Sequence, residues 1–360
     1  MSPKPDLKSI IIEQILLDGP LSIADYMRLC LTHPTLGYYT TREPFGVSGD
    51  FITAPEVSQM FGELIGIWCL DQWQKLGEPN RIQLVELGPG RGTLINDLLR
   101  SAKVRPAFFD AIELHLVEVS PRLQDIQAQT LEASGKRPGF ARGFSDIGDG
   151  PMLIVGNEFL DALPFQQFIK TPTGWLERVV GTADGELRFQ TGTATASISD
   201  MAIANNVPEG TIVEISPART TMIEQIVERL SKSGGSAILI DYGCNRPGTG
   251  DTFQALYKQK PAHPLERSGE QDLTNHVDFC SLIETAKKCG CKSRLKTQRE
   301  FLLEYGLLER AGALGANASP NTQNDIRAAV ERLAGPSEMG DLFKVLEIRS
   351  DRGAFDQETV

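Results

Sequence analysis

The chain has 360 residues, of which 41% are hydrophobic and 23% charged, and its formal net charge is −11. This balance is typical of a globular protein, and a chain of this length buries enough surface to fold without disulfides or metals. The negative charge argues against a protein whose main task is to bind nucleic-acid phosphates.

Cysteine spacing and hydropathy exclude further classes. The six cysteines include no CxxC pair, so reduced thiols are expected rather than a metal site. The first residues lack the pattern of a signal peptide, and no stretch reaches the roughly 18 apolar residues of a membrane span. These patterns predict a cytoplasmic protein without membrane insertion.

Residues 1–78 are predicted to form an N-terminal helical extension with a lid. Apolar residues recur at helical spacing in Lys8–Leu17, and Ser22 can cap a second helix. A segment rich in glycine, aromatic and acidic residues follows and includes Gly49–Glu56. The pattern then predicts one long amphipathic helix over Glu56–Leu76.

From Arg81 the pattern changes to strands alternating with helices, which predicts a mostly parallel sheet with right-handed crossovers. A helix with Ser120 as its N-cap and Pro121 at its first position follows the second strand. A further helix is expected over Val277–Lys288. The expected strands are Ile82–Leu87, Glu113–Val119, Met152–Gly156, Ser236–Ile240, Ser293–Thr297 and Leu342–Ile348.

An insertion interrupts this α/β pattern at about residues 165–213. Short strands joined by turns are expected at Gln166–Lys170, Trp175–Val180 and Glu186–Gln190, and they predict a small antiparallel region. Such insertions often form lids or partner-binding surfaces. The sequence thus predicts one α/β domain over 79–350 with this insertion, followed by a tail at 351–360.

The main chemical signal is the turn Gly88-Pro89-Gly90-Arg91-Gly92, which follows a strand and precedes a helix, as nucleotide-binding turns do. Glycines let the backbone turn sharply and let a ligand approach closely. The dinucleotide fingerprint G-x-G-x-x-G would have its third glycine where Thr93 stands, whereas here it comes early, at Gly92. Glu86 also suits the cationic methionine end of S-adenosylmethionine better than a pyrophosphate. S-adenosylmethionine is therefore favoured over NAD, and a glycine turn that binds nothing is a further alternative.

Polar residues follow the carboxyl ends of the next strands, where open α/β sheets hold their ligands. Glu118 can accept hydrogen bonds from both ribose hydroxyls, and Asp146 can contact the adenine amino group. Asn157, Glu158 and Asp161 follow the fourth strand and suggest cofactor and substrate contacts. The alternative for each is a structural role, as a solvated acid or a capping group.

Two interpretations of Gly49–Glu56 are open. The segment is either the start of a helix with Thr53 as its cap, or a lid that folds over the cofactor. In the second case Asp50 and Thr53 are candidate cofactor contacts.

Taken together, these segments resemble the MidA family of methyltransferases, from about Asp25 to Ile348. The family includes the mitochondrial arginine methyltransferase needed for assembly of respiratory complex I. Gly49–Pro55 and Asn157–Pro164 are the most specific parts, because many methyltransferases share the glycine turn. The segments that carry the resemblance are Phe45–Gly66, Val85–Leu94, Leu116–Pro121, Asn157–Pro164, Asp241-Tyr242-Gly243 and Asp272–Phe279.

The resemblance implies an α/β fold: a Rossmann-like seven-stranded methyltransferase sheet with an N-terminal helical extension and an inserted antiparallel β region. It implies methylation of an arginine in a protein substrate, a complex I (NADH dehydrogenase) subunit. By position, the glycine turn is the cofactor turn, Glu118 is the ribose acid, and Gly49–Thr53 borders the active site. The N-terminus lacks the Arg-rich transit peptide of the members in the mitochondrial matrix, which suggests a bacterial, cytoplasmic protein.

Arginine methylation sets its own requirements. A guanidinium stays charged at neutral pH, so its site needs carboxylates that bind it and accept the proton that it loses on methylation. Glu158 and Asp161 are the best placed by sequence, and Glu214 and Asp241 are weaker candidates at other strand ends. His276 can assist proton transfer.

Three other functions remain open from the sequence. The chain is alternatively a noncatalytic assembly factor that binds S-adenosylmethionine, an NAD-dependent oxidoreductase, or a methyltransferase for a small molecule. The large insertion and the acidic site suit a protein substrate better.

Overall fold

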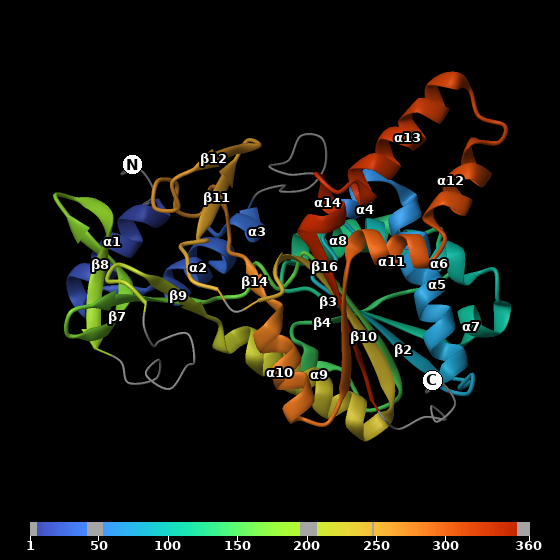
Figure 1. Ribbon diagram of the computed structural model, residues 1–360, viewed down its shortest axis with the longest axis horizontal. Helices are drawn as coiled ribbons and strands as arrows, with labels where there is room; N and C mark the ends of the chain where they lie inside the picture. The colour runs from blue at the N-terminus through green and yellow to red at the C-terminus, as the bar shows by residue number, and fades with distance from the viewer. Residues whose placement is uncertain (1–5, 42–52, 195–206, 247, 351–360) are drawn as a thin grey trace. The chain divides into compact units, whose positions relative to one another are not determined.

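The computed structural model describes residues 6–41, 53–194, 207–246 and 248–350. The chain divides into two compact units (Figure 1). We call Ile52–Leu160, Met222–Gly243 and Ser281–Val360 the sheet unit, and Met1–Phe51, Asp161–Thr221 and Cys244–Cys280 the N-terminal unit.

A large, mostly parallel sheet forms the centre of the sheet unit. Seven strands run in the order β15-β16-β10-β5-β2-β3-β4, and among the described residues an eighth, β14, pairs with β10. Strand β16 is antiparallel to both of its neighbours, β10 and β15. The strands are β2 Ile82–Leu87, β3 Ile112–Val117, β4 Gly139–Ala141, β5 Met152–Asn157, β10 Gly235–Cys244, β14 Val277–Asp278, β15 Lys292–Thr297 and β16 Phe343–Arg349.

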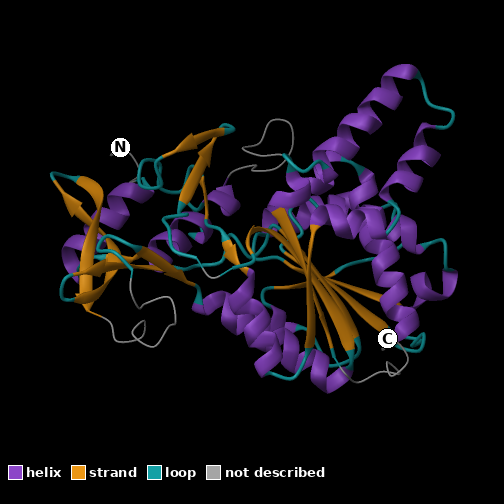
Figure 2. Ribbon diagram, viewed as in Figure 1, coloured by secondary structure: helices purple, strands orange, loops and turns teal. Residues whose placement is uncertain are grey.

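Helices cover both faces of this sheet (Figure 2), with α5, α6 and α11 on one face and α9 and α10 on the other (Figure 1). The expected seven-stranded α/β sheet is thus confirmed. The helical segments of this part of the chain are α4 Ala54–Val57, α5 Gln59–Lys75, α6 Thr93–Ala102, α7 Pro106–Ala111, α8 Pro121–Thr130, η1 Phe144–Asp146, α9 Pro217–Ser233, α10 Phe279–Lys288, α11 Gln298–Glu304, α12 Leu307–Gly315, α13 Pro320–Ala334 and α14 Met339–Leu342.

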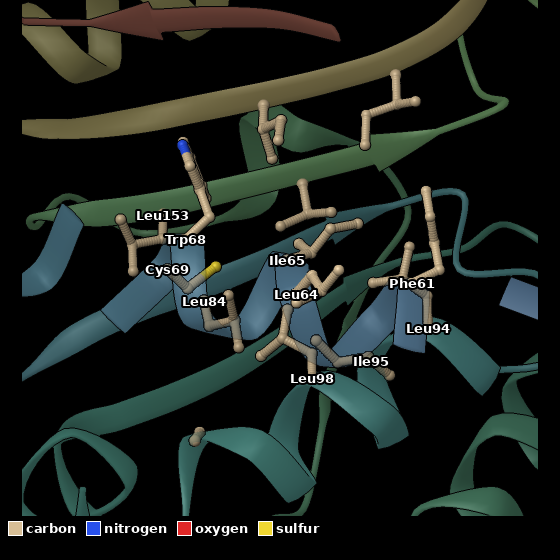
Figure 3. Close-up of a cluster of buried hydrophobic side chains, with 14 of the residues drawn as sticks. Phe61, Leu64, Ile65, Trp68, Cys69, Leu84, Leu94, Ile95, Leu98 and Leu153 are labelled. Atoms are coloured by element: carbon tan, nitrogen blue, oxygen red, sulfur yellow. The ribbon is translucent and has the colours of Figure 1, made fainter. Parts of the chain in front are cut away.

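Hydrophobic side chains from α5, α6 and the sheet form a buried core (Figure 3), and two glycines of α5 let α5 and α6 approach closely. A Cβ at Gly62 would lie 2.8 Å from the carbonyl oxygen of Leu94, and one at Gly66 would lie 2.8 Å from that of Leu98. Side chains from α5 and from strand β2 meet in this core, and Trp68 is fully buried there. Residues 53–78 thus pack as part of the sheet unit, whereas the sequence grouped them with the N-terminal extension.

The single helix expected over Glu56–Leu76 is wrong, because Ser58 interrupts it. Ser58 is extended, with φ −164° and ψ 141°, and its side chain accepts a hydrogen bond from the amide of Met60. A serine competes well for this capping position, so α4 ends at Val57 and α5 starts at Gln59. The helix expected from Val277 likewise starts later, at Phe279, because Val277–Asp278 is a strand.

Antiparallel strands and short helices build the N-terminal unit. One sheet has the order β1-β7-β6-β9 with β8 paired to β7, and another has the order β12-β11-β13. The antiparallel insertion is confirmed, but its strands form sheets of their own that pack with the N-terminal helices. The elements are α1 Leu7–Asp18, β1 Leu21–Ser22, α2 Ile23–Thr32, α3 Tyr38–Thr41, β6 Gln166–Thr171, β7 Gly174–Ala183, β8 Glu186–Ala194, β9 Ile212–Ile215, β11 Gln254–Tyr257, β12 Lys260–Ala262 and β13 Asp272–Thr274.

Within the described ranges, the helices are all too short or too polar to span a lipid bilayer.

Candidate cofactor site

The glycine turn between β2 and α6 needs its glycines for conformational reasons. Gly88, Gly90 and Gly92 have φ values of +62°, +53° and +81°, in the left-handed region that side chains disfavour. A Cβ at Gly88 would also lie 3.0 Å from Cδ2 of Phe159. Gly92 is the N-cap of α6, and it has no side chain that could take up the first amides of this helix.

Glu86 lies on β2, two residues before the turn, and only 3% of it is exposed. Its Oε2 atom has no hydrogen-bond partner among the residues that the structure describes. Burial raises the pKa of this carboxyl from 4.5 to about 8. A buried carboxyl without a partner is costly, so this position suits a ligand that brings a positive charge or a hydrogen-bond donor.

Glu118 follows β3 and is held from two sides. Its Oε1 accepts a hydrogen bond from the amide of Ser120 at 2.7 Å, and its Oε2 accepts one from Nε2 of Gln127 at 3.2 Å. Burial raises the pKa of the Glu118 carboxyl, while these hydrogen bonds oppose the rise. The carboxylate therefore stands at the carboxyl edge of the sheet, as the sequence predicted, in a fixed orientation.

Glu158 joins the end of β5 to the start of α4. It has φ +49°, and its amide donates to the carbonyl of Ile240 at 2.9 Å. Its Oε1 accepts from Nδ2 of Asn157 at 3.0 Å and from the amide of Ala54 at 3.2 Å. Oδ1 of Asn157 is buried and has no hydrogen-bond partner within the described parts of the chain. Two predicted site residues thus meet at this edge, and one buried polar atom there lacks a partner among the described residues.

The end of the predicted lid is attached to the same edge. Thr53 is buried, and within the described residues its side chain makes no capping hydrogen bond to α4. Thr53 still occupies the N-cap position of α4, as one of the two interpretations expected, while the Glu158 side chain accepts the hydrogen bond from the first amide of the helix. Glu56 on α4 accepts a hydrogen bond from Oγ1 of Thr93, the first residue of α6, at 2.6 Å. Asp50 lies outside the described residues.

Asp146 closes its own turn. Its Oδ2 accepts hydrogen bonds from the amides of Arg142 at 3.1 Å and Gly143 at 3.0 Å. These contacts give it the capping role that the sequence left open, and its contact with the adenine stays a prediction.

Comparison with known proteins identifies the family. A model of S-adenosyl-L-methionine-dependent methyltransferases matches residues 64–297. The chain belongs to this family. A Burkholderia thailandensis protein bound to S-adenosyl-homocysteine is 25% identical, with a TM-score of 0.84 over 98% of both chains.

Curated relatives carry a more specific name. The mitochondrial protein arginine methyltransferase NDUFAF7 of Danio rerio is 33% identical, over 94% of this chain and 85% of the relative. The Homo sapiens protein of the same name is 35% identical, over 90% of this chain and 79% of the relative.

The cofactor of this methyltransferase is S-adenosylmethionine, as the sequence predicted, and not NAD. The residues present fit this cofactor. Glu86 is a buried acid that suits its ammonium, and Glu118 is an acid at the next strand end that suits its ribose. The glycine turn, with its positive φ values, allows close approach. When bound, the cofactor supplies an activated methyl group on a sulfonium.

Asp161 and His276, the other candidate catalytic residues of the methyltransferase, belong to the N-terminal unit. One buried network holds both backbones: the amide of Asn275 donates to the carbonyl of Asp161, and Arg219 donates to the carbonyl of His276. Burial lowers the pKa of His276. Arg219 carries no sequence motif, so its part in this network was not foreseen.

The two weaker catalytic candidates have structural contacts. Glu214 accepts hydrogen bonds from Nε2 of Gln167 at 2.7 Å and from the amide of Thr252 at 2.9 Å. Asp241 is fully buried and accepts a hydrogen bond from the amide of Leu160 at 2.9 Å. Both carboxylates hold backbone segments in place, which explains an acid at a strand end without a catalytic role.

Proposed function

We propose that this methyltransferase methylates an arginine side chain of a protein, and that the protein is a subunit of respiratory complex I. The protein arginine substrate is supported by the names of relatives that align over 90% or more of this chain. The complex I target is supported by the resemblance to the MidA family. The relatives are named as mitochondrial, and the cytoplasmic location of this chain stays a prediction.

The cofactor site supports the proposed methyl transfer. Its central observation is that the Glu86 carboxyl is buried and that its Oε2 has no partner among the described residues. In this site Glu86 binds the ammonium of the methionine end, and the glycine turn lies against the cofactor backbone. Glu118 accepts hydrogen bonds from the ribose hydroxyls, and Asn157 offers its Oδ1, which has no partner among the described residues. Asp50, Thr53 and Asp146 are proposed as further contacts, with Thr53 supported by its place beside the attached end of the lid segment.

The proposed catalytic groups are Glu158, Asp161 and His276. As the guanidinium nitrogen bonds to the methyl carbon and the carbon–sulfur bond breaks, one guanidinium proton must leave, because free arginine stays protonated. Carboxylates can both orient the guanidinium and accept that proton. The hydrogen bonds from Asn157 and Ala54 fix the position of the Glu158 carboxylate, which favours it as the orienting group.

A labelling experiment tests the substrate class. Membranes from cells that lack the gene supply complex I in its unmodified form, and the purified protein is added with methyl-labelled S-adenosylmethionine. We expect label on arginine in a complex I subunit, located by mass spectrometry of its peptides. The Gly88→Ala variant, which should not bind the cofactor, is the control. Label on lysine, or only in the small-molecule fraction, would contradict the proposal.

A further inference from the structure

Helix α8 contacts the glycine turn through two side chains that lie on one helical face. Nε2 of Gln127 donates to the carbonyl oxygen of Gly90 at 2.8 Å. Oγ1 of Thr130, three residues later, donates to the carbonyl oxygen of Arg91 at 2.9 Å. Residues three apart share a helical face, so α8 holds two successive carbonyls of the turn.

The Gln127 side chain also reaches the proposed ribose acid. The same Nε2 donates to Oε2 of Glu118 at 3.2 Å, and the residue is fully buried. Both acceptors of Nε2 are oxygens, which settles the orientation of the amide, because the flipped form would place Oε1 against them. Oε1 has no hydrogen-bond partner in the part of the chain that the structure describes. This buried amide links the two cofactor-binding elements. Burying its oxygen without a partner costs free energy, and packing alone does not explain why a polar side chain stands here.

The direction of the Gly90 carbonyl decides what the turn presents to a ligand. In a trans peptide the carbonyl and the following amide point in opposite directions. Because the Gly90 oxygen points to Gln127, the amide of Arg91 points away from α8. Gly90 lacks a Cβ, so this peptide could rotate easily without a hydrogen bond to hold it. If this peptide rotated, the side of the turn that faces away from α8 would present the Gly90 carbonyl oxygen instead of the Arg91 amide.

We infer that Gln127 is a positioning residue that holds the glycine turn and the Glu118 carboxylate in the arrangement that binds S-adenosylmethionine. Thr130 supports the same turn through the next carbonyl. The inference rests on the proposed cofactor site and extends it to a helix that has no cofactor motif.

Affinity for S-adenosylhomocysteine, measured by calorimetry, tests this inference. Gln127→Met keeps the length and removes the amide, and we expect affinity to fall at least about tenfold, as for loss of a hydrogen bond to a charged group. Thr130→Val should reduce it about threefold. Gln129→Met on the exposed side of α8 is the matched control and should bind as the wild type does.

A double-mutant cycle separates positioning from packing. If Gln127 acts through Glu118, Gln127→Met should weaken binding less in a Glu118→Gln background than in the wild type. In turnover, Gln127→Met should raise KM for S-adenosylmethionine while kcat changes little. A purely structural residue would instead lower the melting temperature of the ligand-free protein and leave KM unchanged.

The outcomes distinguish two failures. If Glu118→Gln binds the ligand as tightly as the wild type, the proposed cofactor site is wrong. If Glu118→Gln binds weakly but Gln127→Met and Thr130→Val bind normally, the site stands and the inference about α8 is overturned. Should Gln127→Met not fold, Thr130→Val alone decides, because unchanged affinity in that variant contradicts the role of α8.

Discussion

Replacing Glu86 with glutamine should stabilise the ligand-free protein while it weakens cofactor binding. Glu86 is buried, and its Oε2 has no partner among the described residues. Burial raises its pKa from 4.5 to about 8. One pKa unit corresponds to about 1.4 kcal/mol, so ionising this carboxyl in the folded protein costs up to about 5 kcal/mol.

The effect should depend on pH in a defined direction. Because the pKa is higher in the folded than in the unfolded chain, the contribution of Glu86 is most favourable below pH 4.5 and is lost as pH rises to about 8. Glutamine does not titrate. The gain in free energy of unfolding from Glu86→Gln should therefore be small near pH 5.5 and reach its full value near pH 8.5.

Urea unfolding of both proteins at a series of pH values measures this gain. The same variant should bind S-adenosylhomocysteine about tenfold or more weakly, because a charged partner for the ammonium is lost. A stability difference that does not change between pH 5.5 and 8.5 would refute the reasoning about Glu86. Equal affinity in the two proteins would remove it from the cofactor site.

Three further substitutions test the site and the core. Gly88→Ala should abolish S-adenosylhomocysteine binding in calorimetry, because its φ is +62° and a Cβ meets Phe159 at 3.0 Å; retained binding would contradict the close approach. Glu158→Gln should abolish methyl transfer and leave calorimetric binding nearly intact, and unchanged turnover would exclude Glu158 from catalysis. Gly66→Ala should lower the free energy of unfolding, measured in urea, by about 1–3 kcal/mol, because the added Cβ overlaps the Ser101 side chain. An unchanged urea midpoint would mean that α5 and α6 can move apart without loss of stability.

The lid segment shows how local sequence can mislead. Thr53 looks like a helix cap from its neighbours, and Glu56–Leu76 looks like one helix. In the fold, Thr53 is the N-cap of α4, but Glu158 accepts the hydrogen bond from the Ala54 amide, and Ser58 starts a new helix. A residue more than 100 positions away decides the first of these, so no local pattern could have shown it.

The sequence by itself determined the glycine turn, Glu86 and Glu118, because a buried strand, a left-handed turn and a strand-end acid are local features with few alternatives. It also predicted the central parallel sheet, since hydrophobic periodicity alternates there between strand and helix. Only the tertiary structure joined Gln127 to Gly90 and to Glu118. It alone also placed the N-terminal helices with the inserted strands, because contacts between distant segments depend on packing that local patterns do not encode.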